Sequence, residues 1–552
     1  MKHIRILTLL LLCNIFIVPS ALAQAKPGKS VFTLTTFKPD GTILASTNGV
    51  FVGSEGEAVS AWTPFVGAAR AVCIDADGQS HNVEAIYGAN ELYDVCRFRV
   101  SGTTQPLPLA KSNASAGSKL SLVGYSVKSA SSKSYTVKSV ETFGEQKFGY
   151  YIMNEKAAEN MANCPFVNKN GELVGILQLA KNNEETHAVD ARFMQTFTTN
   201  GLSINDAMLR RSRIRTALPN QLDDARLTLM MVGEKGDSAA YSNYTDDFLR
   251  QFPTAIDGYT ARAQQELAAK RYAEADATMQ KALNNVSDKA EAHSAYASLI
   301  YQKEIYMPDS ASLSWSLTKA LDEARTAYNL KKMPIYQHQE AQILYSMGQY
   351  QEAYDRFLAL TQSDIRNGEL FYEAAQCRTH LGGTHDEVLA LLDSAVAVNP
   401  DNSISAPYYL ARGRFLDQAG ETRRAVRDYN KYDTLMLGRA SHDFYYVKFK
   451  AESKIKQYQQ ALNDIAHAIV LNRAEPTYYA EMASLQLRVK QYEDAIRTAD
   501  LCISVEPEYS DPYIIKGIAQ GELKQKAEAL KTLQKAHELG DERAAELIEK
   551  YK

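Results

Sequence analysis

The carboxy-terminal half of the chain repeats a unit of 34 residues, and this period constrains the fold more than any other feature of the sequence. Small residues at Ala461, Ala495 and Ala529 mark the same position in three consecutive copies. The copies read YYVKFKAESKIKQYQQALNDIAHAIVLNRAEP, YYAEMASLQLRVKQYEDAIRTADLCISVEPEYS and YIIKGIAQGELKQKAEALKTLQKAHELG. Because a unit of this length cannot bury its apolar face alone, the copies are expected to stack into an all-α solenoid.

Earlier copies are phased from these three, with an insertion around 306–314 and a weaker first copy over about 221–253. Their small residues are Ala275, Ala320, Ala353, Val388 and Ala425. The first helix of most units carries a tyrosine, at Tyr259, Tyr372, Tyr409, Tyr445, Tyr479 and Tyr513. Since stacked units bury each other's faces, we interpret these alanines and tyrosines as core residues rather than ligand contacts.

The period and its small residues resemble the tetratricopeptide (TPR) repeat. That resemblance implies a superhelix whose first helices face a concave groove that binds protein or peptide. The residues at the groove positions are Arg414, Tyr446, Lys450, Lys454, Ser484 and Arg488. Because Lys450 and Lys454 share a helix face, a basic groove suited to an extended or acidic peptide is one interpretation. The other interpretation is that these residues form a solvated charged face that binds no ligand.

The segment from about 31 to 197 has a different sequence pattern: short alternating runs of apolar and polar residues are separated by glycine and polar turns. Runs such as VFTLTT, VCRFRV and KLSLVGY have the period of two that is typical of half-buried strands. Several such runs at this spacing predict an all-β sandwich or barrel, and the length suits two small barrels packed together.

The order of these segments resembles the trypsin-like serine peptidases of the chymotrypsin fold, including the HtrA type. The family's general-base segment is matched by STNGVFVGSEGEAVSAWTPFVGA. Its aspartate segment is matched by DGQSHNVEAIYGANELYDVCRFRV. NMANCPFVNKNGELVGI matches the nucleophile segment GNSGGP(L/F)VNxxGEVVGI except in its first five residues. The resemblance covers nearly all of the segment and implies a double β-barrel.

Carrying the catalytic positions over puts the general base on Thr63, the aspartate on Asp94 and the nucleophile on Ala162. A methyl group cannot attack a carbonyl, and a threonine hydroxyl cannot accept a proton at neutral pH as an imidazole does. The family's oxyanion hole uses a glycine two residues before the nucleophile, where this chain has Asn160. The resemblance therefore implies a pseudoprotease.

Cys164 leaves an enzymatic alternative open. Cysteine replaces serine in relatives of this fold, but at the nucleophile position, two residues before Cys164. Of the histidines in this segment, His81 and His187 lie outside the family's general-base position. The alternative is a serine- or cysteine-type endopeptidase with non-standard residues, whose repeat array recruits substrate.

The amino terminus has the pattern of a secretory signal peptide. Lys2, His3 and Arg5 precede an apolar run over 6–18, which is shorter than the roughly 20 residues of a membrane span. Cleavage is expected after Ala23. We therefore expect an exported protein of the periplasm or cell surface with no transmembrane segment in its mature chain. The formal net charge of −4 gives no indication of a nucleic-acid partner.

Five cysteines follow the signal peptide, without the CxxC or Cys/His spacing of a zinc site, so neither a metal nor a cofactor is expected. Cys73 and Cys96 lie in strand-like segments of one domain and are the candidate disulfide of an exported chain. The odd count leaves at least one thiol free.

The sequence thus predicts a multidomain chain that resembles exported Bacteroidetes proteins of this architecture. The expected parts are the signal peptide (1–23), a trypsin-like pseudoprotease domain (24–200), a helical connection with the first weak repeat (201–257), the TPR array (258–540) and a capping helix (541–552). The predicted function is that of a protein-interaction scaffold or adaptor.

Overall fold

The computed structural model describes residues 26–178, 185–308 and 315–552. The expected signal peptide and most of the expected insertion at 306–314 lie outside these ranges. Contacts between residues divide the chain into two compact units, one ending at Ser287 and the other spanning Asp288–Lys552. An all-β double barrel is followed by an all-α array, which confirms the predicted fold class.

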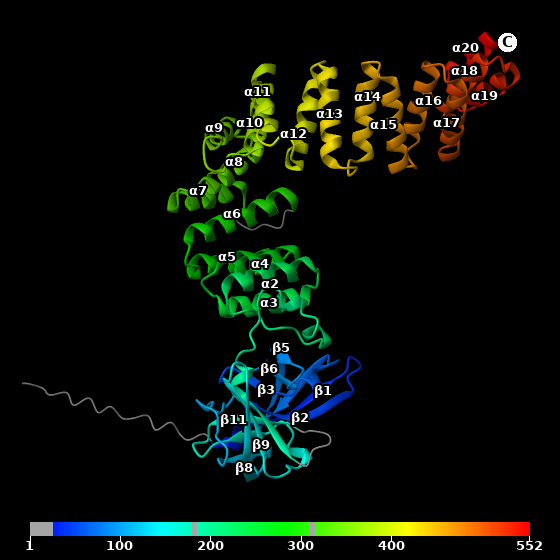
Figure 1. Ribbon diagram of the computed structural model, residues 1–552. Helices are drawn as coiled ribbons and strands as arrows, with labels where there is room; N and C mark the ends of the chain where they lie inside the picture. Colours follow the sequence, from blue (N-terminus) through cyan, green and yellow to red (C-terminus); the bar gives the residue numbers. More distant parts are fainter. Residues whose placement is uncertain (1–25, 179–184, 309–314) are drawn as a thin grey trace, which may run out of the picture. The chain divides into compact units, whose positions relative to one another are not determined.

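The first barrel closes six antiparallel strands in the order β1-β2-β3-β6-β5-β4 (Figure 1). Alternate residues of its strands point inwards, and Phe32, Phe51 and Phe98 meet in its core. The strands are β1 (Val31–Phe37), β2 (Ile43–Phe51), β3 (Glu57–Ser60), β4 (Arg70–Ile74), β5 (Ser80–Asn90) and β6 (Val95–Val100).

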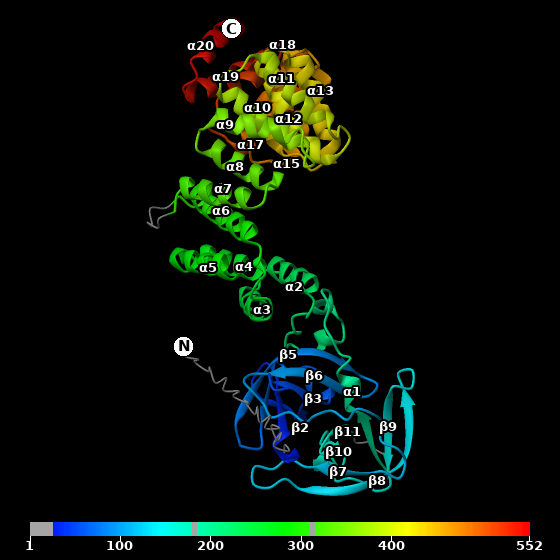
Figure 2. The ribbon, with the colours of Figure 1, turned by 90° about the vertical axis from the view of Figure 1, so that its left-hand side faces the viewer.

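The second barrel closes in the order β10-β11-β12-β9-β8-β7 (Figure 2). Its core includes Phe166 and Tyr135, whose rings meet edge to face. The strands are β7 (Lys119–Val123), β8 (Ser132–Phe143), β9 (Phe148–Met153), β10 (Pro165–Val167), β11 (Leu173–Gln178) and β12 (Thr186–Asp190). A short helix, α1 (Ala191–Met194), follows β12 and begins with Asp190 as its side-chain cap.

The candidate disulfide between Cys73 and Cys96 is not formed. Both residues are buried free thiols in the core of the first barrel. The other three cysteines within the described ranges are also buried and free, but they lie in the second barrel and in the helical array. Cys73 lies on β4 and Cys96 on β6, and β5 runs between these two strands. Strand-like sequence placed both cysteines in one core, but the topology does not make their strands neighbours.

Residues after the second barrel return to the first barrel before the helices begin. Ile86 on β5 donates its N–H to the Arg215 carbonyl, at 2.9 Å, and its carbonyl accepts from the Ala217 N–H, at 2.8 Å. These bonds make a parallel bridge between Ile86 and Thr216. The connection after the second barrel therefore pairs with β5 at one isolated bridge.

A buried carboxylate fixes the first helices to the same barrel. Asp247 accepts a hydrogen bond of 2.9 Å from Arg99 of β6 and also pairs with Arg215 and Arg250. Burial would raise the pKa of Asp247, but the hydrogen bond and charge of Arg215, together with the charges of Arg99 and Arg250, outweigh it, so the pKa is lowered. The barrel and the first helices are thus joined by a buried ionic cluster.

Consecutive helices then pack against one another as hairpin-like pairs. In the first unit they are α2 (Leu222–Glu234), α3 (Ser238–Gln251), α4 (Ile256–Ala268) and α5 (Tyr272–Asn285). In the second they are α6 (Lys289–Tyr306), α7 (Leu317–Leu330), α8 (Pro334–Ser346), α9 (Tyr350–Leu360), α10 (Gly368–His380), α11 (His385–Ala397), α12 (Ala406–Gln418), α13 (Thr422–Met436), α14 (His442–Lys454), α15 (Tyr458–Leu471), α16 (Pro476–Arg488), α17 (Tyr492–Val505), α18 (Asp511–Glu522), α19 (Lys526–Glu538) and α20 (Arg543–Tyr551).

The periodic small residues are core residues, as predicted. All eight, from Ala275 to Ala529, are buried. Tyr259, Tyr409, Tyr445 and Tyr479 are buried as predicted, and the Tyr409 hydroxyl donates to the Pro400 carbonyl at 3.2 Å. Tyr372 and Tyr513 are only half-buried, and Tyr372 lines a pocket between the helices, so the prediction was wrong for these two. None of the described helices is long and apolar enough to span a bilayer.

Candidate functional site

Thr63 and Asp94, the positions matched to the general base and its aspartate, lie in contact. Thr63 begins a 3₁₀ turn (Thr63–Phe65) after β3, and Asp94 immediately precedes β6 with a left-handed φ of 44°. Asp94 Oδ1 accepts from the Thr63 backbone N–H at 2.7 Å and from its hydroxyl at 2.8 Å. The carboxylate thus holds the threonine in place.

Ala162, matched to the nucleophile, follows a 3₁₀ turn over Glu159–Met161. Its backbone N–H donates to the Glu159 carbonyl at 3.1 Å, so this amide is engaged within the turn. From the first barrel, the Asn48 side-chain amide donates to the Asn160 and Ala162 carbonyls, each at 3.0 Å. The segment is therefore fixed by its own turn and by β2.

Asn163 strengthens this link between the barrels. Its backbone has a left-handed φ of 61°, and its side chain donates to the Thr47 hydroxyl at 2.7 Å. The resemblance drew attention to 160–164 but not to Thr47 or Asn48. These two partners precede the segment by more than 110 residues, and no local pattern marks them.

Cys164 is buried in the second barrel. Its backbone N–H donates to the Met161 carbonyl at 3.0 Å, and its carbonyl accepts from Leu177 at 3.0 Å. Burial raises the pKa of the Cys164 thiol to about 12, and the hydrogen bond from the Tyr125 backbone opposes that rise only in part. The thiolate needed for nucleophilic attack is therefore scarce at neutral pH.

The two histidines of this domain have other partners. His81 Nε2 lies 3.1 Å from Asp75 Oδ2, and its Nδ1 lies 2.9 Å from the Ser101 carbonyl. His187 Nδ1 lies 3.1 Å from the Tyr150 hydroxyl. Within the described ranges, no group of three or more His, Cys, Asp or Glu side chains is arranged to hold a metal ion.

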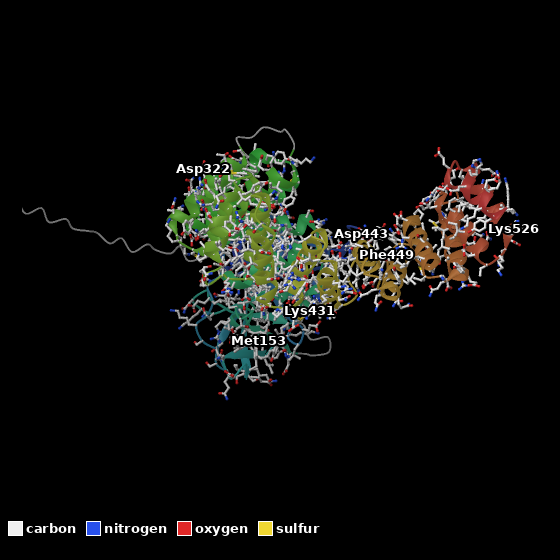
Figure 3. All side chains as sticks on the ribbon, turned by 90° about the horizontal axis from the view of Figure 1, so that it is seen from above. Met153, Asp322, Lys431, Asp443, Phe449 and Lys526 are labelled. Atoms are coloured by element: carbon white, nitrogen blue, oxygen red, sulfur yellow. The ribbon has the colours of Figure 1, made fainter. Side chains whose placement is uncertain are left out.

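Four of the six predicted groove residues come together in the helical array. Lys450 and Lys454 of α14 and Ser484 and Arg488 of α16 line one pocket of about 280 Å³. Phe449, labelled in Figure 3, forms part of its apolar wall. Tyr446 lies beside this pocket, with the Lys450 ammonium 4.3 Å from its ring centroid.

Lys454 is not a free cation. Its ammonium lies 3.1 Å from both carboxylate oxygens of Asp417 on α12. Lys450 and Arg488 make no ion pair with a described residue. The ammonium of Lys450 instead contacts the Tyr446 ring. The basic character of the pocket therefore rests on Lys450 and Arg488, and the carboxylate of Glu481 in the same lining reduces it.

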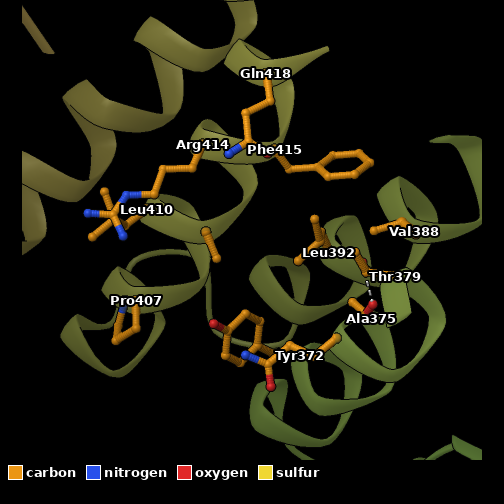
Figure 4. A pocket seen from close by; sticks show the side chains of 12 residues that line it. Tyr372, Ala375, Thr379, Val388, Leu392, Pro407, Leu410, Arg414, Phe415 and Gln418 are labelled. Atoms are coloured by element: carbon orange, nitrogen blue, oxygen red, sulfur yellow. Dashed lines mark hydrogen bonds between the residues drawn. The ribbon is translucent and has the colours of Figure 1, made fainter. Parts of the chain in front are cut away.

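Arg414 lines a separate pocket of about 380 Å³ between α10, α11 and α12. Figure 4 shows Arg414 and Phe415 on one wall and Val388 and Leu392 across from them. Most of the lining is apolar. The structure therefore divides the predicted groove into two sites: a mainly apolar pocket with one arginine and a smaller basic pocket.

No protein-family model matches this chain, and no curated protein matches it.

Proposed function

We propose that the protein is an exported, non-catalytic scaffold that binds protein or peptide through its helical array. The observation that carries the loss of catalysis is the Ala162 amide, whose N–H donates to Glu159 and not towards a substrate oxygen. An oxyanion hole requires that such an N–H is free and pointed at the developing charge. The side chain at the same position is a methyl group.

The remaining positions support the same proposal. The Thr63 hydroxyl and backbone N–H both donate to Asp94, so the retained carboxylate stabilises a turn where the peptidase family has it orient a base. The buried, high-pKa Cys164 argues against the cysteine-peptidase alternative, since a reactive cysteine needs an accessible thiolate.

For the helical array, the proposal rests on the TPR-like repeat and on its two lined pockets. An apolar pocket beside Arg414 and a basic pocket beside Arg488 are suited to a segment that carries both apolar and acidic side chains. Export to the periplasm or cell surface belongs to the same proposal and rests on the amino-terminal sequence.

The catalytic half of the proposal is tested with purified protein, casein and a serine-directed phosphonate probe. We expect neither turnover nor labelling, with an active trypsin-like peptidase as the positive control. The Cys164→Ala variant is assayed in parallel. Turnover in the native chain that disappears in this variant would establish the rewired peptidase.

The binding half is tested by affinity capture from the native envelope, followed by rebinding of the purified partner. Charge reversal by Lys450→Glu with Arg488→Glu is expected to abolish rebinding. Lys454 is left intact, because its reversal would place a glutamate against Asp417. The matched control is Arg423→Glu with Arg427→Glu, two exposed arginines on α13 that line neither pocket. Equal rebinding by both variants would exclude the basic pocket.

A further inference from the structure

The largest of the described pockets lies on the double barrel, away from the matched catalytic positions. Its volume is about 900 Å³. The chain before β1, the β4–β5 turn, β7 with its following loop, and the β10–β11 turn contribute to its walls. None of Thr63, Asp94 and Ala162 lines it. A volume of this size is within the range of about 300–1,000 Å³ typical of ligand sites.

All charged side chains that line this pocket are positive. Its lining includes the lysines Lys26, Lys29, Lys128 and Lys169 and no carboxylate. Lys29 pairs with Asp77, outside the lining. The other three make no ion pair with a described residue, although the chain as a whole carries a net charge of −4. Cationic side chains around a concavity concentrate anions there.

The floor and walls of the pocket are built by the fold. Val123 of β7 and Val167 of β10 are buried beneath it, together with Ala76 from the first barrel. The wall before β1 is tightly packed, since a Cβ at Gly28 would lie 2.3 Å from Ala130 Cβ. An apolar floor with a lysine rim can accept a ligand that has both apolar and anionic groups.

We propose that this pocket binds an acidic peptide segment in which small apolar side chains alternate with carboxylates. Alternation places carboxylates against the lysine rim and apolar side chains on the valine floor, because successive residues of an extended chain point to opposite sides. Hydroxyls of Ser121, Ser126 and Ser132 line the same space and can bond to the peptide backbone. This site is independent of the helical array and of any catalysis.

The test is fluorescence anisotropy of the full mature chain with a labelled peptide of four Glu-Val repeats. The peptide of four Gln-Val repeats is the matched neutral ligand. We expect saturable binding of the glutamate peptide that weakens as salt is raised, and at least tenfold weaker binding of the glutamine peptide. Equal binding of the two peptides would overturn the proposal.

Variants then place the binding in the pocket. Lys128→Glu with Lys169→Glu is expected to weaken the glutamate peptide by about tenfold or more, since two attractions become repulsions. Lys111→Glu with Lys156→Glu makes the same change of charge at exposed barrel lysines outside the lining and is expected to bind as the native chain does. Thermal unfolding of both variants confirms that the barrels are folded.

Equal loss in the two variants would show a general charge effect and overturn the site. Inorganic phosphate and vesicles containing phosphatidylglycerol are tested as competitors. Vesicle binding without peptide binding would replace the acidic peptide by a membrane surface and would also overturn the proposal.

Discussion

Arg99 of strand β6 and Asp247 of helix α3 are joined by a 2.9 Å hydrogen bond although 148 residues separate them in sequence. Asp247 is almost fully buried, and its three cationic partners come from the barrel, from the connection and from its own helix. The first barrel and the first helices therefore share one buried carboxylate in their packing.

Replacing this carboxylate by an amide is expected to destabilise the first compact unit. Removing one partner of a buried ion pair leaves the other uncompensated and costs about 3–5 kcal/mol. For Asp247→Asn we expect a loss of that size in the free energy of unfolding. Urea unfolding followed by Trp62 fluorescence, in a Trp315→Phe background, measures it.

The adjacent residue supplies the control. Asp246 is exposed and pairs with Arg262, so Asp246→Asn is expected to cost about 0–1 kcal/mol. Similar losses in the two variants would show that the buried cluster contributes no more than a surface ion pair.

Restoring the side chains of the peptidase family is not expected to restore the enzyme. In the double variant Thr63→His with Ala162→Ser, the backbone N–H at 162 remains bonded to the Glu159 carbonyl, and Asn48 still holds the carbonyls at 160 and 162. We expect no casein turnover and no phosphonate labelling. Labelling of the double variant would show that only the two side chains had been lost.

A buried carboxyl group in α14 predicts a pH dependence of stability. Burial raises the pKa of Glu452 to about 8, and its hydrogen bond with Asp464 adds to the rise. Lys448 lies 3.2 Å from Asp464 and 3.1 Å from Asp433 within the same cluster. The raised pKa favours the protonated form of Glu452 in the folded protein.

The folded pKa lies above the unfolded value, so this group contributes fully below about pH 4.5, and its contribution is lost as the pH rises through about 8. Glu452→Gln keeps a hydrogen-bond donor without titration; glutamine occupies the equivalent sites Gln486 and Gln520 of the next two repeats. Between pH 5 and 8, the Tm of the native chain is expected to fall relative to that of this variant. Parallel melting curves would contradict the assignment.

The free thiols give a direct test of burial. All five cysteines after the expected signal peptide are buried, and burial raises the pKa of each of them. Ellman's reagent is expected to modify none in the folded mature chain and all five in guanidinium chloride. Rapid modification of Cys164 in the folded protein would reopen the cysteine-peptidase alternative.

Periodic features of the fold could be predicted from the sequence because each one is local. Period-two runs predicted the strands, and a 34-residue spacing predicted buried alanines such as Ala461 and Ala495. The same spacing placed Lys454 and Arg488, which are 34 residues apart, at one pocket, since equivalent positions of stacked repeats face the same side.

Partners distant in sequence could not be predicted in this way. The contacts of Asn48 with Ala162 and of Arg99 with Asp247 depend on how the strands close and on the path of the connection. The pairing of Lys454 with Asp417 likewise depends on the packing of neighbouring repeats. For the same reason, strand-like sequence alone could not show that β5 separates Cys73 from Cys96.

The parallel bridge at Ile86 also determines how tension would travel through the chain. A pull on the residues after Ala217 would be carried by these two backbone bonds and, further along the chain, by the buried pairs of Asp247 with Arg99 and Arg215. The connection would therefore transmit force to the first barrel instead of acting as a flexible linker.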